Sequence, residues 1–386
     1  MVTSLVLSKK IFFDNEDLIT EQGKIKLKQL SEKYKCIILS NNSAKLKKEV
    51  LDFINDNIFF LTRNEFRSIY KANVSKLEKI SIYVIGCVDK DADIGFNFKR
   101  MIFHPTWIED CSEKITKYGH PVSNIDNLIR AIEIMAIHKN NYYTMNSSDQ
   151  FVVTSIFNAN TLGNYVSNDE KEIRDIFNKV LKKNNKRGFT ELYYHIISEI
   201  LKNPVYKSVD LWGVFPSSKE GNENEFMEYI KDRIRLINGK RITNNVFVRY
   251  SDMPAKKDSQ SNRLIFKSSK DFETLEINPN LTKNPKNNIK GKTICIVDDY
   301  ITNGYSAEAA KHILLNAGAK KVIFLSIGKY GSRYFNTNYQ LISDKKSIYT
   351  RDYKFRFFNE KEHKTGYSQN SSELLTIYKM IEWYVE

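Results

Sequence analysis

The chain has 386 residues, of which 60 are Lys or Arg and 46 are Asp or Glu, so its net charge is +14; 41% of its residues are hydrophobic. This composition excludes a chain that is disordered throughout, and the length favours two domains of roughly 100–200 residues each. No stretch reaches the ~18 apolar residues of a membrane span, and the opening MVTSLVLSKK becomes charged too early for a secretory signal. The four cysteines form no CxxC pair, which favours a reducing, cytoplasmic location and predicts no structural zinc site.

Apolar runs alternate with helical periodicity through the first part of the chain. Residues 4–7 and 11–13 predict two short strands, or one strand continued into a hairpin. A helix is expected over 124–138, with Asn124 as its N-cap. Further strands are predicted at 36–42, 58–62 and 81–86, and further helices at 23–34 and 46–56. This alternation predicts a parallel, doubly wound sheet.

A polar stretch at 140–149 is typical of a linker, and a second α/β segment follows it. Strands are expected at 209–216, 245–250, 292–299 and 321–328, and helices at 171–183, 192–202, 306–319 and 373–385. Residues 251–291 are polar, rich in Lys and Arg and poor in periodicity, which indicates a functional or disordered loop. We therefore expect an α/β protein with two domains, 1–145 and 146–386, the second with a C-terminal extension.

The most informative motif is IVDDYITNGYS, in which an apolar strand leads into Asp298 and Asp299 and then into a helix. The carboxyl ends of parallel strands are where α/β sheets bind ligands. The turn after the acids brings hydroxyl groups and backbone N–H groups to a helix N-terminus, a combination that suits a phosphate. Gly304 allows the backbone to approach such a ligand closely. Carboxylates beside a phosphate-binding turn suit a sugar phosphate, because the acids can pair with sugar hydroxyls while backbone N–H groups hold the phosphate.

This motif resembles the signature of type I phosphoribosyltransferases, which bind 5-phosphoribosyl 1-diphosphate (PRPP), and the AEAAKHILLNAGAKKVIFLSIGK that follows is also similar to that family. The resemblance covers roughly residues 170–335. It implies that Asp298 and Asp299 contact the ribose 2′ and 3′ hydroxyls. The residues implied for the 5′-phosphate are Thr302, Asn303, Gly304, Tyr305 and Ser306. Those implied for the diphosphate are Ser217, Ser218 and Lys219 in a loop after a strand, and Lys256, Lys257 and Arg263 in a mobile loop.

The resemblance implies cleavage of the C1–O bond of PRPP through an oxocarbenium-like transition state, with Mg²⁺ on the diphosphate. A nucleotide used in the reverse direction is an equivalent substrate. Thr302 stands where purine-salvage members often carry an acid, so a general base is missing there, and Asn303 and Tyr305 replace smaller or hydroxyl-bearing residues. The acceptor base is therefore left open.

The opening LVLSKKIFFDNEDLITEQGKIKLKQLSEKYKCIILSNN resembles a haloacid-dehalogenase (HAD)-like phosphatase domain. In that family the first strand ends in Asp-x-Asp and the second in Ser or Thr, a position that Ser40 matches. With SLVLS as the first strand, Ser8 and Lys10 replace the two aspartates; with IFF as the strand, the pair is Asp14 and Glu16. The first alignment leaves no carboxylate nucleophile.

SIYVIGCVDKDAD resembles the acidic motif that holds Mg²⁺ in HAD-like enzymes, through Asp89, Asp91 or Asp93. The family's lysine is matched by Lys71, Lys76 or Lys79. We expect a HAD-like domain without phosphatase activity; an active phosphatase using Asp14 and an unrelated α/β domain are the alternatives.

Three classes of function remain open for the whole chain. The first is a Mg²⁺-dependent phosphoribosyltransferase, and the second is a non-catalytic sensor of PRPP or a nucleotide. The third is a nucleic-acid-associated effector of a stress or anti-phage system, which the basic residues between 256 and 292 favour. A protein partner or a homo-oligomer is compatible with each. The six histidines are scattered, with no HExxH pairing, and none is assigned a metal.

Overall fold

The computed structural model describes residues 3–161, 166–221, 223–253, 268–282, 289–342, 353–363 and 371–382. The chain is an α/β protein that divides into two compact units. Unit 1 comprises residues 1–136 with the short segment 236–239, and unit 2 comprises the rest. The sequence placed the boundary between residues 145 and 146. Among the described residues, no helix is long and apolar enough to cross a membrane.

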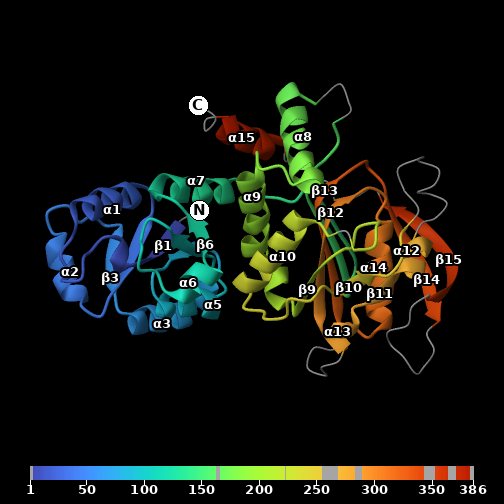
Figure 1. Ribbon diagram of the computed structural model, residues 1–386, viewed down its shortest axis with the longest axis horizontal. Coiled ribbons are helices and arrows are strands. Elements are labelled where there is room, and N and C mark those ends of the chain that lie inside the picture. Colours follow the sequence, from blue (N-terminus) through green and yellow to red (C-terminus); the bar gives the residue numbers. More distant parts are fainter. Residues whose placement is uncertain are drawn as a thin grey trace. The chain divides into compact units, whose positions relative to one another are not determined.

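Unit 1 is built on a six-stranded parallel sheet with the order β3-β2-β1-β4-β5-β6 (Figure 1). The strands are β1 (Thr3–Ser8), β2 (Lys35–Leu39), β3 (Ile58–Leu61), β4 (Ser81–Ile85), β5 (Ile102–Pro105) and β6 (His120–Val122). The connecting helices are α1 (Glu21–Lys33), α2 (Ser43–Glu49), α3 (Arg63–Ala72), α4 (Val74–Leu77), α5 (Asp89–Asn97) and α6 (Glu113–Tyr118), and α7 (Ile125–Ile137) follows β6. The strand order reverses between β1 and β4, so the carboxyl ends of these two strands flank the crevice where such sheets bind ligands.

Local sequence explains where several of these helices begin. Thr20 caps α1 by accepting a hydrogen bond from the Gly23 backbone N–H, and Thr62 and Glu65 form a reciprocal capping box at α3. The expected cap at Asn124 is confirmed, because its side chain accepts the N–H of Asn127 at 2.8 Å. The predicted second strand at 11–13 is wrong: a 3₁₀ turn (Lys9–Ile11) follows β1, and beyond it only Phe13 makes an isolated bridge.

Unit 2 contains a five-stranded sheet with the order β7-β8-β13-β12-β9, in which only β7 is antiparallel to its neighbour (Figure 1). Its strands are β7 (Tyr143–Ser148), β8 (Phe151–Asn158), β9 (Leu211–Val214), β12 (Thr293–Ile301) and β13 (Lys321–Lys329). Two small antiparallel pairs accompany it, β10 (Phe247–Arg249) with β11 (Leu275–Ile277) and β14 (Tyr334–Ile342) with β15 (Lys354–His363). Its helices are α8 (Asn168–Lys183), α9 (Phe189–Lys202), α10 (Glu225–Ile237), α12 (Ser269–Thr274), α13 (Pro279–Thr282), α14 (Tyr305–Asn316) and α15 (Ser371–Glu382), with a 3₁₀ turn (Pro204–Ser208) before β9.

Two predictions for this unit are corrected by the structure. The expected linker at 140–149 contains β7, whose alternating Tyr143 and Met145 are buried while Thr144 and Asn146 are exposed. The segment 251–291, expected to be irregular, contains α12, β11 and α13 among its described residues. Both segments were interpreted from their polar composition. The alternation of buried and exposed residues in 140–149 and the three short elements in 251–291 were therefore missed.

The interior of unit 2 explains why its parallel strands form where they do. Residues 293–297 of β12 are all buried, and β13 is buried from Val322 to Lys329. A central parallel strand is covered on both faces, so it reads as a continuous apolar run rather than an alternating one. β12 lies inside the sheet, with β13 on one side and the edge strand β9 on the other, and it carries the acidic motif at its carboxyl end.

Candidate functional site

The acidic pair lies inside β12 rather than after it, because the strand continues through Asp298, Asp299 and Tyr300 to Ile301. On one side β13 accompanies it to the end, pairing Ile301 with Lys329. On the other side β9 stops opposite Val297. Beyond that point one edge of β12 is no longer paired in this sheet, and both carboxylates lie on this half-buried segment.

The two carboxylates have partners of their own. Asp298 accepts the backbone N–H of Asp299 at 2.9 Å, and Asp299 accepts that of Tyr300 at 2.6 Å. The second oxygen of Asp299 forms an ion pair with Lys182 of α8, whose side chain is 48% exposed. Because Lys182 is so exposed, this ion pair contributes little to stability. Sequence reasoning missed Lys182 because nothing distinguishes it from the other surface lysines of its helix.

The phosphate turn predicted at 302–306 links β12 to α14. Gly304 precedes the helix with a φ of +85° and offers no side chain to cap the first N–H groups of α14. The backbone of this turn is fixed from two directions: the Nζ of Lys329 donates to the carbonyl of Thr302 at 2.8 Å, and the N–H of Phe335 donates to that of Asn303 at 3.0 Å. The start of a twelve-residue helix thus directs N–H groups and a partial positive charge beyond the end of a central strand.

Tyr305 and Ser306 form the first turn of α14 and differ in exposure. Tyr305 is buried: its ring stacks on Phe335 with centroids 5.7 Å apart, and its hydroxyl donates to Glu360 at 3.3 Å. Ser306 is half-buried. Of these two side chains, only the hydroxyl of Ser306 lies where a ligand at the turn could use it without displacing a packed ring.

Lys329 is a buried residue that sequence reasoning did not single out. Its Nζ donates to three backbone carbonyls, those of Thr302, Tyr330 and Arg333, and it lies 5.2 Å from the centre of the Tyr143 ring. Burial lowers the pKa of this lysine to about 8. Its role is to hold the end of the turn, and the only signal in the sequence was a lysine closing an otherwise apolar strand.

The loop predicted to hold diphosphate follows β9 and lies beside the acidic pair, since the N–H of Phe215 donates to the carbonyl of Val297 at 2.8 Å. The Ser217 hydroxyl donates to the carbonyl of Lys219 at 3.0 Å, and the carbonyl of Ser218 accepts the N–H of Met253 at 2.7 Å. Lys219 is exposed. The predicted residues Lys256, Lys257 and Arg263 lie outside the described residues.

This loop is anchored by Arg249, a residue that the sequence did not indicate. Its guanidinium donates to the carbonyls of Pro216 and Ser217 and forms an ion pair with Asp271 at 3.1 Å. Both partners of the ion pair are buried, with side-chain exposures of 2% and 0%. Its effect is to hold the backbone of the loop at the end of β9.

In unit 1, the residues predicted from the HAD-like motifs fall into two groups. Ser8 ends β1 and Ser40 follows β2; both are buried, at neighbouring strand ends. Lys10 donates to the carbonyl of Asp110 at 3.3 Å. By contrast, Asp14 is exposed in a turn, where it accepts the N–H groups of Glu16 and Leu18.

The three aspartates that follow β4 also differ in their exposure and in their partners. Asp89 is exposed and Asp93 is half-buried, and the two share Lys114, at 3.9 and 3.3 Å. Asp91 is 1% exposed, forms an ion pair with Arg63 at 2.7 Å and accepts the N–H groups of Cys87 and Val88. A buried, fully partnered carboxylate of this kind stabilises the start of α5.

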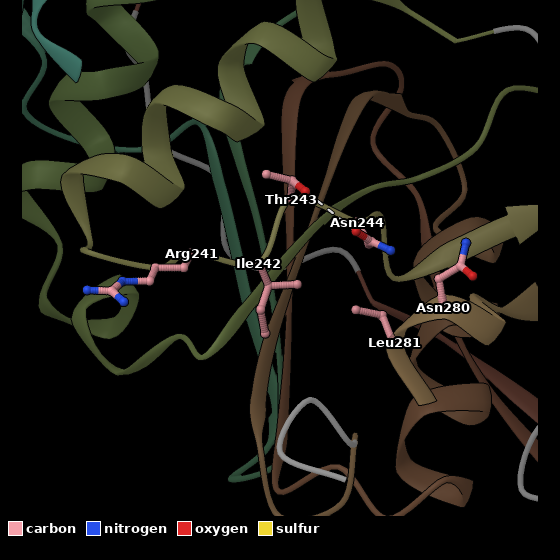
Figure 2. Close-up of a pocket in the computed structure, with 6 residues that line it drawn as sticks. All are labelled: Arg241, Ile242, Thr243, Asn244, Asn280 and Leu281. Atoms are coloured by element: carbon pink, nitrogen blue, oxygen red, sulfur yellow. Dashed lines mark hydrogen bonds between the residues drawn. The ribbon is translucent and has the colours of Figure 1, made fainter. Parts of the chain in front are cut away.

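One group that could hold a metal ion was not predicted. His138, His195 and Glu373 are buried, and their ligand atoms all lie within 4.8 Å of one another. Separately, a pocket of about 340 Å³ is lined by Arg241, Ile242, Thr243, Asn244, Asn280 and Leu281. In Figure 2 Arg241 extends away from the other lining residues, and none of the predicted site residues lines this pocket.

These observations define a two-unit α/β protein with a parallel sheet in unit 1, a mostly parallel sheet in unit 2, and a candidate site on unit 2 built from two carboxylates, a turn and a helix start. Comparison with protein-family models, curated proteins and solved structures finds no match for the chain.

Proposed function

We propose that unit 2 binds a phosphorylated ribose, as PRPP or a nucleotide, at the carboxyl end of β12 and acts as a phosphoribosyltransferase-like protein. The observation that carries this proposal is that three features follow one another along the chain. They are two half-buried carboxylates on β12, a turn whose backbone is held by hydrogen bonds, and the uncapped start of α14. Carboxylates pair with sugar hydroxyls and helix N-termini with phosphate, so the two ends of a ribose 5-phosphate match the two ends of this segment.

Each part of this site would bind a different part of the substrate. Asp298 and Asp299 would orient the ribose, with Lys182 released from Asp299 as the ligand enters. The N–H groups at the start of α14 and the hydroxyl of Ser306 would hold the 5′-phosphate. The loop at Ser217–Lys219 would hold the leaving diphosphate, with its backbone fixed by Arg249.

A Mg²⁺ ion fits this proposal, because carboxylate and phosphate oxygens are the ligands it prefers. Asp298 and Asp299 would hold the ion beside the substrate, and its chemistry there would be to neutralise the charge of the diphosphate. Thr302 brings no carboxylate to the turn. No side chain at this position would therefore act as a base and take a proton from the acceptor.

The test is calorimetric titration of PRPP with Mg²⁺ into the full chain, followed by a diphosphate-release assay with a panel of bases and nucleotides. We expect Asp298→Asn and Asp299→Asn each to weaken PRPP binding at least tenfold. The matched control is Asp175→Asn, which removes an exposed carboxylate of α8 that forms an ion pair with Lys179 at i+4. Binding that is indifferent to both variants would refute the site, and binding without release would make the protein a sensor rather than an enzyme.

For unit 1 we propose a HAD-like domain that does not work as a phosphatase. Support comes from the end of β1, where the resemblance would put Ser8 and Lys10 in place of the nucleophile and the acid, and from the exposed turn that holds Asp14. Phosphatase activity of the full chain on p-nitrophenyl phosphate that disappears with Asp14→Asn would overturn this proposal. Glu16→Gln, in the same exposed turn, tests the second acid of that alternative.

A further inference from the structure

We propose that His138, His195 and Glu373 bind a divalent transition-metal ion, with Glu199 as the carboxylate that orients His138. All four residues belong to unit 2. The three ligand atoms lie within 4.8 Å of one another, and none of the four residues is more than 7% exposed. The site is separate from the carboxylates of β12 and does not depend on the function proposed for them.

Glu373 is held so that one oxygen is left for a ligand. Its Oε1 accepts the backbone N–H groups of Lys139 at 3.0 Å and Asn140 at 3.3 Å. Its Oε2 lies 3.2 Å from Nδ1 of His138. Two backbone donors fix the plane of the carboxylate, so Oε2 and Nδ1 converge on one point.

Glu199 occupies the other side of the His138 ring. Its Oε2 lies 3.0 Å from Nε2 of His138, while its Oε1 accepts the side-chain amides of Asn141 at 2.8 Å and Asn203 at 2.9 Å. Histidines that bind metals characteristically donate their second ring N–H to a carboxylate. This partner assigns the proton to Nε2 and leaves the lone pair of Nδ1 facing Glu373.

His195 supplies the independent observation. It is completely buried, and neither of its ring nitrogens has a hydrogen-bond partner in the part of the chain that the structure describes. Its ring lies 4.9 Å from that of His138, edge to face. His195 precedes Glu199 by one turn of α9, so both project from the same face of that helix. Buried polar groups are nearly always satisfied, and a metal ion would bind one of these two nitrogens.

The competing arrangement is a metal-free ion triad in which a protonated His138 donates to both carboxylates. That arrangement accounts for the contacts of His138, Glu199 and Glu373 but leaves both nitrogens of His195 unsatisfied. A metal ion at the convergence point accounts for the same contacts and also binds one nitrogen of His195. Two imidazoles and one carboxylate are a ligand set of Zn²⁺ and of neighbouring first-row metals.

Such an ion would join three segments that are far apart in the sequence: the residue after α7, the middle of α9, and α15. α15 already contacts α8 through the hydroxyl of Tyr378, which donates to Glu172 at 2.7 Å. The metal would fasten the amino-terminal end of α15 to the rest of unit 2, so its removal should loosen this helix first.

The experiment uses the full chain, stripped with chelator and then titrated with Zn²⁺, with metal content measured by mass spectrometry after dialysis. We expect one Zn²⁺ per chain and a thermal unfolding midpoint that rises on binding. His195→Gln and Glu373→Gln should each weaken Zn²⁺ binding at least tenfold. The control His363→Gln, at the end of β15, should leave stoichiometry and affinity unchanged.

A second measurement covers the case in which the cluster variants fail to fold. Co²⁺ added to the stripped wild-type chain should give the visible absorption of a four-coordinate site, and Zn²⁺ should abolish it. Failure of the wild-type chain to bind Zn²⁺ or Co²⁺ stoichiometrically would overturn the proposal, as would equal binding by folded His195→Gln. Because PRPP titration reports on Asp298 and Asp299, either proposal can fail while the other stands.

Discussion

The Nζ of Lys329, at the end of β13, donates a hydrogen bond to the backbone carbonyl of Thr302, at the end of β12, over 2.8 Å. The lysine is completely buried, and within the described part of the chain its Nζ donates to three backbone carbonyls rather than to a carboxylate. A buried cation without a counter-ion is costly, so the position of the turn at 302–306 is maintained at the expense of stability.

Lys329 should make the stability of the protein depend on alkaline pH. Because burial lowers its pKa to about 8 in the folded chain, the protonated form destabilises the fold below that pH. This penalty disappears as the pH rises from about 8 towards the unfolded value of about 10.4. Relative to Lys329→Met, the wild type should gain roughly 3 kcal/mol of unfolding free energy across this window.

The measurement is urea unfolding of both proteins at several pH values between 7.5 and 10. Lys320→Met, which replaces an exposed lysine before β13, controls for the loss of one positive charge. A wild-type-minus-variant difference that stays flat with pH would show that Lys329 titrates normally.

Gly304 should be irreplaceable for two separable reasons. Its φ of +85° is unfavourable for other residues, and a Cβ there would lie within 2.7 Å of three atoms of the buried Tyr334 ring. Gly291 isolates the first reason, since its φ is +75° but nothing lies within 4 Å of an added Cβ. We expect Gly291→Ala to lower the unfolding free energy by about 1–2 kcal/mol and Gly304→Ala to lower it by clearly more.

Chemical denaturation of the two alanine variants measures this difference. Equal losses would mean that the Tyr334 ring moves aside without cost. That outcome is not expected, because the Tyr334 hydroxyl is held by Glu308 at 2.8 Å, and Glu308 also accepts the N–H of Thr337.

Asp271 should be important for stability although it lies outside the predicted site. Removing one partner of a buried ion pair leaves the other charge uncompensated, so Asp271→Asn should cost about 3–5 kcal/mol. Asp175→Asn breaks an exposed pair on α8 and should cost no more than about 0.5 kcal/mol. Differential scanning calorimetry of both variants tests this contrast, and similar midpoints would show that Arg249 finds another partner.

Elements defined by local periodicity could be predicted from the sequence. The helix expected over 23–34 is α1 (Glu21–Lys33), and the buried strand expected at 292–299 is β12 (Thr293–Ile301). In α1 the spacing of the apolar residues marks the covered side, and in β12 the continuous apolar run marks a strand that is covered on both faces. β7 was missed because its three exposed positions and its Asn and Ser residues resemble a linker, while its pairing with β8 is a tertiary contact that composition does not reveal.

The residues of the candidate site also differ in whether the sequence could indicate them. Asp298, Asp299 and the turn after them are consecutive, so a short motif could indicate them. Lys182, Lys329 and Arg249 act through contacts that exist only once α8, β13 and β10 are in place. The cluster of His138, His195 and Glu373 is the extreme case, because each ligand comes from a distant part of the chain and no spacing rule connects them.

Cys111 should be the first of the four cysteines to react with an alkylating agent. A hydrogen bond from the Cys87 thiol, helped by the charge of Lys10, lowers the pKa of Cys111, which is partly exposed. Cys36, Cys87 and Cys295 are buried, and burial raises the pKa of Cys36 to about 12. Since the thiolate is the reactive form, iodoacetamide should modify Cys111 in the folded protein while the other three stay intact.

Mass spectrometry of peptides from the native, alkylated protein gives the order of reaction, and the rate measured against pH tests its cause. Cys87→Ala removes the hydrogen-bond donor, so the pH profile for Cys111 should move to higher pH. The matched control Cys295→Ala, in unit 2, should leave the profile where it is. If the profile does not move in Cys87→Ala, the Cys87 thiol does not stabilise the Cys111 thiolate, and exposure alone would then set the order of reaction.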